Sequence, residues 1–296
     1  MNLFTSSPIH VHAEPKSFSP MIVLFLVLTA FLYFRGWLCL RRTSPVLFPV
    51  WSLVTFLSGL LVLLLAVSSP LGVLDHQLLT AHMVKHLLLM VVAAPLILFG
   101  KGQPILRGLP NWFTHISLFT TRLRSLWGSL SGNSIFCWLA GTTTVIAWHI
   151  PYFFQLGLSS RAWHTIEDAS FLCAGLLFWK PIITRQANGA NTAQWLLVLY
   201  LFLATVPCDI LSAFLSFCGR VLYPHYLSTS QTFSLSALQD QECAGALMWV
   251  TVTFAYLIPA VLITANILST DGTHFQIGSS ASRGTIAAEI EMKTTA

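Results

Sequence analysis

The sequence contains long apolar stretches, each with enough residues to cross a lipid bilayer as a helix. A spanning helix needs about 20 mostly apolar residues. Seven stretches reach this length: residues 20–40, 49–68, 77–99, 134–155, 163–184, 193–217 and 242–267. Only 8% of the 296 residues are charged, whereas a soluble domain has about 25%. We therefore predict an all-α fold, a polytopic membrane helix bundle with seven transmembrane helices.

These stretches divide the chain into three predicted parts. Residues 1–19 form a polar extracytoplasmic segment, residues 20–267 form the seven-span membrane domain, and residues 268–296 form a polar, flexible cytoplasmic tail. The orientation follows from Lys and Arg, which are enriched in cytoplasmic loops. The odd-numbered loops hold nine of these basic residues and the even-numbered loops hold two. We therefore expect the N-terminus outside and the C-terminus in the cytoplasm.

Other patterns exclude several classes of function. The basic residues are scattered, with no cluster longer than Arg41 and Arg42, so no nucleic-acid partner is predicted. None of the six cysteines forms a CxxC pair, and most lie in apolar runs, which is typical of inert buried thiols. The chain lacks GxSxG, HExxH and glycine-rich phosphate motifs. We therefore expect a protein that contacts membrane lipid and is not an enzyme.

The third apolar stretch carries histidines in its outer half. His82, His86 and Met90 are spaced at i, i+4 and i+8, so they share one stripe of a helix. A single histidine in a span often serves only as a hydrogen-bonding partner for a neighbouring helix. A pair at this spacing, with a thioether one turn further on, instead favours a metal site.

The fifth stretch offers a second polar face to this site. Its residues His164, Glu167 and Asp168 are spaced at i, i+3 and i+4, and His149 ends the fourth stretch at the same depth. Ligand-bearing faces on neighbouring helices can form an intramembrane metal site. Imidazole suits copper, zinc, iron and nickel, and thioether sulfur shifts the preference toward Cu(I). The predicted metal ligands are His82, His86, His149, His164, Met90, Glu167 and Asp168.

Four more charged residues are candidates for an ion path or for support of the metal ligands. Lys85 lies beside the histidine stripe, and because an unpaired ammonium is costly at that depth, we predict that it pairs with Asp168 or Asp209. Asp209 lies deep in the sixth stretch, where a carboxylate is a functional hypothesis by default. Asp240 and Glu242 open the seventh stretch and are predicted to form an acidic mouth that attracts cations.

The N-terminal segment contains a second, weaker candidate site. His10 and His12 are separated by one residue in the sequence HVH. Imidazoles at this spacing can capture a metal ion, although a short histidine pair is often simply solvated. We treat the pair as a candidate for metal capture outside the membrane.

Four segments resemble the CtaG family of caa3-type cytochrome c oxidase assembly factors. In chain order they read HMVKHLLLMVVAAPLILFGKGQP, WHIPYFF, WHTIEDASFLCAGLLFWKPII and LYPHYLSTSQTFSLSALQDQECAGALMWV. The resemblance covers about residues 8–265. The combination of four segments in this order is more specific than any one of them.

This resemblance implies a function in the maturation of haem-copper oxidase. It implies a seven-span protein of the bacterial cytoplasmic (inner) membrane that assists copper delivery from the extracytoplasmic side, with oxidase subunits and other copper chaperones as partners. By motif position, the family's histidines correspond to His82, His86, His149 and His164. The family usually carries HxxEH in the fifth span, but here Asp168 replaces the second histidine. A carboxylate is a harder ligand than imidazole and suits Cu(I) less well.

Two alternative functions use the same residues. The histidines could ligate haem in a membrane redox protein, since haem ligation by two histidines needs one from each of two helices. The chain could also be a metal or proton transporter, with Lys85 and Asp209 on the ion path.

Overall fold

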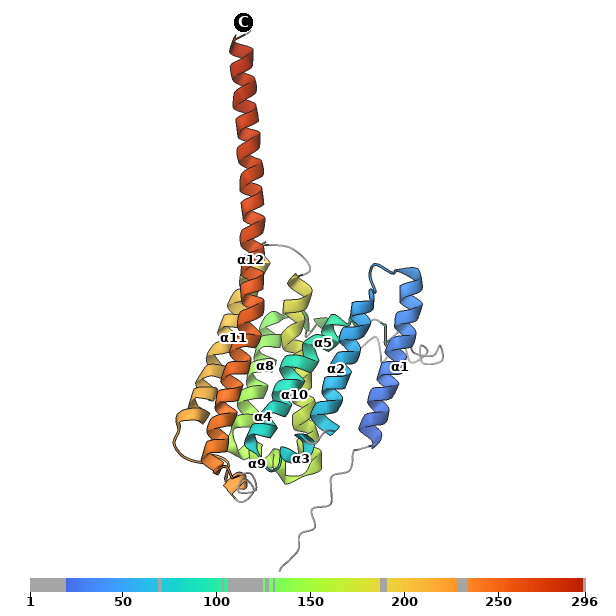
Figure 1. The fold of residues 1–296 in the computed structure, drawn as a ribbon, viewed down its shortest axis with the longest axis vertical. Coiled ribbons are helices and arrows are strands. Elements are labelled where there is room, and N and C mark those ends of the chain that lie inside the picture. Colours follow the sequence, from blue (N-terminus) through green and yellow to red (C-terminus); the bar gives the residue numbers. More distant parts are fainter. Residues whose placement is uncertain are drawn as a thin grey trace, which may run out of the picture.

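The computed structural model describes residues 20–68, 71–102, 131–186, 191–227 and 234–294, with a few isolated positions between 104 and 129. Every regular element among these residues is a helix, which confirms the all-α prediction. The long helices stand side by side as a bundle (Figure 1). His10 and His12, the predicted capture site, lie outside the described residues.

The helices follow the apolar stretches of the sequence closely. In chain order they are α1 (Pro20–Thr43), α2 (Val50–Ser68), α3 (Leu71–Leu74), α4 (Leu79–Leu87), the π-helix η1 (Leu88–Ala93), α5 (Ala94–Phe99), α8 (Ser134–His149), α9 (Pro151–Ser159), α10 (Arg161–Gln186), α11 (Asn191–Phe217), the 3-10 helix η3 (Pro224–Leu227) and α12 (Ala237–Thr294).

Five helical segments of the described chain are long and apolar enough to cross a membrane. They are Pro20–Thr43, Val50–Ser68, Leu79–Phe99, Gln194–Phe217 and Ala237–Ser269. The other two predicted spans also fold as helices, but α8 has only 16 residues and α10 carries charged residues near both of its ends. The count of seven spans and the orientation of the termini therefore stay predictions.

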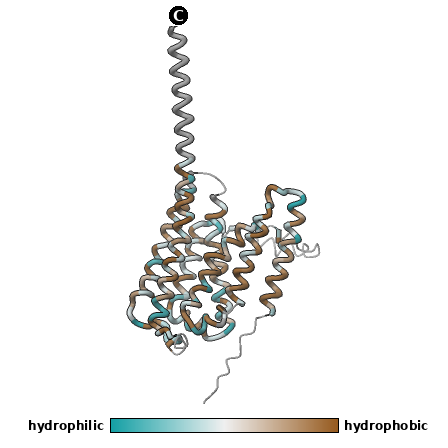
Figure 2. Tube along the Cα trace, viewed as in Figure 1, coloured by the Kyte–Doolittle hydropathy of each residue, from teal (hydrophilic) through white to brown (hydrophobic). Residues whose placement is uncertain are grey.

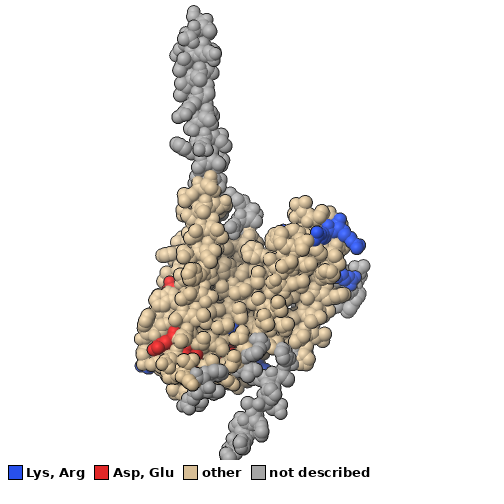
Figure 3. All heavy atoms as spheres, in the orientation of Figure 1, with Lys and Arg blue, Asp and Glu red and all other residues tan. Residues whose placement is uncertain are grey.

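The outside of the bundle is apolar, as a lipid-facing surface must be. Large apolar side chains such as Phe25, Phe202 and Ile210 are more than half exposed. Apolar residues run along the length of the long helices (Figure 2), and charged side chains are sparse on the face of the molecule in Figure 3. Because this surface would not be stable in water, the described helices are those of a membrane protein.

The N-terminus of α4 is held by a carboxylate from α12. Leu78 has an extended backbone, so the first amide groups of α4 have no partners within the helix. Asp240 accepts hydrogen bonds from the Leu79 amide at 2.6 Å and from the Thr80 amide at 3.0 Å. Asp240 is fully buried, so the prediction that it belongs to an exposed acidic mouth is wrong. Its charge stabilises a helix end instead.

The third span is not a continuous α-helix. The Ala94 amide bonds the Leu89 carbonyl, five residues back, which makes residues Leu88–Ala93 a π-helix. This leaves the Met90 carbonyl without its usual partner, and it accepts a hydrogen bond from the Trp179 indole of α10 at 2.9 Å. Gly175 lets α10 approach this point, because a Cβ there would lie 2.9 Å from the Met90 carbonyl oxygen.

The fourth predicted span is broken near its C-terminal end. Ile150 has extended φ and ψ angles of −67° and 127°, and Pro151 begins α9. The helical conformation is unfavourable for a residue that precedes proline. The prediction of one continuous helix over residues 134–155 is therefore wrong. The break makes His149 the last residue of α8. The short helix α9 then packs against the first part of α10.

The last helix extends beyond the predicted seventh span. The prediction for residues 268–296 was a flexible tail, but the backbone of α12 continues as a helix to Thr294 (Figure 1). Apolar residues up to Ile267 explain the first part of this helix, since Ile263 and Ile267 are fully buried.

Candidate functional site

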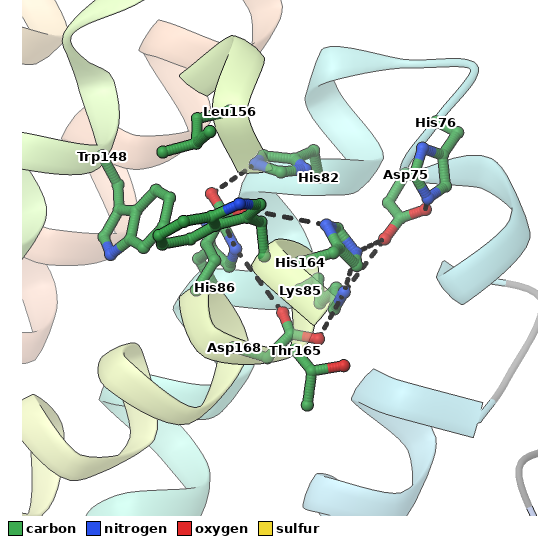
Figure 4. A network of polar contacts seen from close by, with 12 residues as sticks. Asp75, His76, His82, Lys85, His86, Trp148, Leu156, His164, Thr165 and Asp168 are labelled. Carbon is green, nitrogen blue, oxygen red and sulfur yellow. Dashed lines mark hydrogen bonds and ion pairs between the residues drawn. The ribbon is translucent and has the colours of Figure 1, made fainter. Parts of the chain in front are cut away.

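A buried network of charged side chains links α4, α10 and the turn before α4. The Lys85 ammonium lies 2.8 Å from the Asp168 carboxylate and 3.0 Å from the Asp75 carboxylate (Figure 4). Pairing with Asp168 matches the sequence prediction. Pairing with Asp209 does not occur, and Asp75 is a partner that the sequence analysis missed. Two carboxylates on one ammonium make this buried charge tolerable.

His164 joins this network from the start of α10. Its Nε2 atom lies 2.9 Å from the Asp75 carboxylate and 2.6 Å from the Lys85 Nζ atom, and its Nδ1 atom lies 3.5 Å from Glu167. Burial alone would raise the pKa of Asp75, but the hydrogen bond from His164 and the charge of Lys85 outweigh burial and hold that pKa well below its usual range. Asp75 is therefore ionised in the folded protein.

Three side chains with potential metal-ligand atoms converge beside this network. His82 Nε2 lies 3.3 Å from Glu167 Oε1, and His86 Nε2 lies 3.7 Å from the same oxygen. One donor atom from each residue lies within 4.8 Å of the other two. His82 and Glu167 are only 1% exposed, yet these nitrogen atoms and both Glu167 oxygens have no well-aligned hydrogen-bond partner among the described residues. We call His82, His86 and Glu167 the upper cluster.

The local fold explains why Glu167 points into the upper cluster. Gly157 of α9 faces it, and a Cβ at position 157 would lie 2.5 Å from Glu167 Oε2. A larger residue there would push the carboxylate away from the two imidazoles. The ring of Phe154, also on α9, covers His82 with ring centroids 5.0 Å apart. The break at Ile150 thus places a helix that shapes the cluster.

His149 is buried near the upper cluster but is not one of its three converging donors. Its Nδ1 atom lies 2.6 Å from the Val145 carbonyl oxygen. A carbonyl can only accept, so Nδ1 carries the hydrogen and Nε2 keeps its lone pair. That Nε2 atom is buried without a hydrogen-bond partner among the described residues. His149 and His86 line a cavity of about 30 Å³.

Met90 reaches the same small cavity from the π-helix. The sequence analysis placed Met90 on a regular stripe with His82 and His86. The stripe is altered after His86 because the π-helix begins at Leu88. Met90 still lies near His86, since both side chains line the cavity. Met90 is not part of the upper cluster.

A second group of potential metal ligands lies at the end of the network next to α3. One atom each from Asp75, His76 and His164 lie within 4.8 Å of one another. The Lys85 ammonium contacts Asp75 and His164 in this group, so a positive charge already occupies this place. Sequence reasoning missed Asp75 because it lies in the turn before the span, where neither periodicity nor spacing links it to α10.

Asp209 and Glu242 stand apart from the site. Among the described residues neither forms an ion pair. Asp209 lies on α11 with one carboxylate oxygen buried and unpartnered, and its neighbours Pro207 and Ile210 line an apolar groove between α8 and α11 of about 910 Å³. Glu242 is half-buried near the start of α12. The predicted ion path through Asp209 and Lys85 is therefore not continuous in the described part of the chain.

Comparison with known proteins adds one match. A family model described as cytochrome c oxidase caa3 assembly factor (Caa3_CtaG) matches residues 31–270. The matched region contains the upper cluster, the charged network and the small cavity. Neither the comparison with curated proteins nor the comparison with solved structures gave a match.

Proposed function

Because the chain belongs to the family of caa3-type cytochrome c oxidase assembly factors, we propose that it assists oxidase assembly by holding a copper ion in the upper cluster and passing it on. Copper is then cargo rather than a resident cofactor. His82, His86 and Glu167 supply the ligand atoms. The oxidase subunits that receive the ion are the natural partners, together with a donor that loads it from the extracytoplasmic side.

The spacing of the donor atoms is the observation that carries this proposal. Metal bonds of about 2.1 Å at tetrahedral angles place two ligand atoms about 3.4 Å apart. The distances from Glu167 Oε1 to His82 Nε2 and His86 Nε2 are 3.3 and 3.7 Å. Buried polar atoms without hydrogen-bond partners are rare in folded proteins, and a cation among these three would satisfy them.

Asp168, which replaces the second histidine of the family's HxxEH pattern, lies beside the upper cluster. Asp168 Oδ2 pairs with Lys85 at 2.8 Å, while its Oδ1 atom lies 3.7 Å from His86 Nε2. This carboxylate anchors the ammonium and places a negative charge beside the His86 ring, so it is a supporting residue in the proposal. Partners of this kind typically change metal affinity by about 10- to 100-fold when they are removed.

The geometry favours a metal ion over haem at these histidines. The His86 ring stacks on Phe171 with centroids 3.9 Å apart. The cavity beside His86 and His149 has a volume of about 30 Å³, whereas pockets for drug-sized ligands and cofactors measure about 300–1,000 Å³. A macrocycle would require several packed aromatic side chains to move.

The proposal is tested by the metal content of the purified protein and by oxidase activity in cells. The double variant His82→Ala/His86→Ala should hold less copper than the wild type, and cells carrying it should lose oxidase activity, while the amount of the variant in the membrane stays near that of the wild type. His225→Ala is the matched control, because it removes an exposed imidazole outside the cluster. A copper content equal to that of the wild type, with oxidase activity unchanged, would refute the proposal.

A further inference from the structure

The small cavity has an unusual lining. Six helical elements contribute to it: α4, η1, α8, α10, α11 and α12. Half of the twelve lining residues carry a nitrogen or sulfur donor, namely Met83, His86, Met90, His149, Cys208 and Met248. The lining contains no carboxylate and no basic side chain other than the two imidazoles. The potential metal ligands of this cavity are therefore soft nitrogen and sulfur atoms in apolar surroundings.

Methionine alone would be a weak argument, since it often fills irregular gaps in a core. Here three of the six methionines of the chain line one cavity. The second observation comes from the histidines. His86 and His149 each have a buried Nε2 atom without a hydrogen-bond partner among the described residues, and His149 is only 8% exposed. If the methionines only filled gaps in a core, the two buried imidazole nitrogens without hydrogen-bond partners would stay unexplained.

The chemistry of the lining selects one kind of ion. Thioether and imidazole ligands suit Cu(I), whereas carboxylates suit harder ions. A charge in an apolar interior is costly, and the cost rises with the charge. With no carboxylate in the lining, nothing would compensate a divalent ion. A monovalent soft ion fits both the donors and the low polarity of the cavity.

We propose that this cavity is a second metal site, which holds Cu(I) through Met83, Met90 and Met248 together with His86 or His149. The inference rests on the proposed function and deepens it. His86 belongs to both places, because its Nε2 atom lies 3.7 Å from Glu167 Oε1 in the upper cluster and its side chain lines the cavity. A copper ion can therefore move between the two sites without leaving protein ligands.

The test separates the two sites by their ligands. The full-length protein in detergent is titrated without oxygen against Cu(I) in competition with a coloured chelator, and bound copper is examined by X-ray absorption for sulfur neighbours. In the wild type we expect copper–sulfur scattering. The triple variant Met83→Leu/Met90→Leu/Met248→Leu should lose that signal and at least one equivalent of Cu(I), while Zn²⁺ binding at the upper cluster is retained.

Two further variants complete the design. Glu167→Gln should lose Zn²⁺ binding and keep the copper–sulfur signal, because Glu167 does not line the cavity. Met21→Leu is the matched control, since Met21 is 78% exposed on α1. Leucine conserves the approximate volume of methionine, and the single variant Met248→Leu provides a milder change if the triple variant is unstable.

The outcomes distinguish this inference from the proposed function. If the triple variant keeps both its Cu(I) equivalents and its sulfur signal, the cavity is ordinary core packing and the inference is wrong. If the wild type binds metal with no sulfur neighbours, only the upper cluster is a site, and the inference is again wrong. If the wild type binds neither copper nor zinc, the proposed function fails as well.

Discussion

At the scale of single residues, the Lys85 ammonium holds together side chains from three parts of the chain. It contacts Asp75, Asp168 and His164, and it is 2% exposed. Both aspartates are themselves shielded from water, and both pair with this one ammonium. Removing one partner from a buried ion pair is strongly destabilising because it leaves an uncompensated charge.

We expect Lys85→Met to lower the free energy of unfolding by about 3–5 kcal/mol. The methionine fills similar space, so the loss comes from two carboxylates that keep their burial but lose their partner. Thermal unfolding of the purified protein in detergent measures the effect. Arg220→Gln removes an exposed charge and should change stability by no more than about 0.5 kcal/mol. Equal stability of the two variants would contradict the buried network.

A second residue-scale prediction concerns Gly157. The substitution Gly157→Ala places a methyl group 2.5 Å from Glu167 Oε2, which must displace the carboxylate from the two imidazoles. We expect the affinity of the upper cluster for Zn²⁺ to fall by about 10- to 100-fold, measured by competition with a chelator. At Gly132 a Cβ would meet nothing within 4 Å, so Gly132→Ala should bind zinc like the wild type.

At the scale of helices, the decisive contact is the one by which α12 caps α4. Asp240 accepts two backbone hydrogen bonds there, and the Thr80 hydroxyl donates to the same carboxylate at 2.6 Å. The contact fixes the first turn of the helix that carries His82 and His86. The position of the upper cluster thus depends on a residue more than 150 positions further along the chain.

We expect Asp240→Ala to lower the free energy of unfolding by about 1–3 kcal/mol, because the α4 amide groups lose their acceptor in a buried place. Glu242→Ala, two positions further along α12, removes a half-buried carboxylate that caps no helix and should have a smaller effect. The comparison uses thermal unfolding under the same conditions. A larger loss from Glu242→Ala would mean that Asp240 is not the cap.

Much of this architecture was predictable from the sequence, for physical reasons. Apolar runs of sufficient length predicted seven spans, because the bilayer thickness fixes their length, and five described helices are long and apolar enough to be spans. The helical period predicted that His82 and His86 share a face, and their rings lie 4.3 Å apart. The helical period did not predict the π-helix, whose Met90 carbonyl accepts a hydrogen bond from the Trp179 indole of another helix. The break at Ile150 had a local signal in Pro151 that the apolar pattern concealed.

At the scale of the whole molecule, the two ends of the bundle differ in chemistry. Arg41 and Arg42 end α1, and the end of α1 lies at the opposite end of the bundle from α3 and α9 (Figure 1). The charged network lies near α3, because Asp75 directly follows that helix, and the upper cluster lies near α9, because Gly157 of α9 faces Glu167. Basic residues mark the cytoplasmic side of a membrane protein. The candidate site is therefore expected on the extracytoplasmic side.

This orientation is tested with a reporter at the C-terminus. A fluorescent protein that folds only in the cytoplasm, fused after Ala296, should fluoresce in whole cells. An enzyme that is active only outside the cytoplasm should be inactive at the same position and active when inserted after Leu227, in the segment that follows η3. The reverse pattern would place the metal ligands on the cytoplasmic side and would require a different source of copper.

One mechanical consequence follows from the way α12 is placed. Helix α12 contains Asp240, which bonds the start of α4. Two turns further along, it contains Met248, which lines the small cavity. These positions are about 12 Å apart along the helix axis. A tilt of α12 would therefore change both the hydrogen bonds from the α4 amide groups to Asp240 and the shape of the small cavity. In the proposed function, a partner that shifts α12 would therefore act on the upper cluster and on the small cavity at the same time.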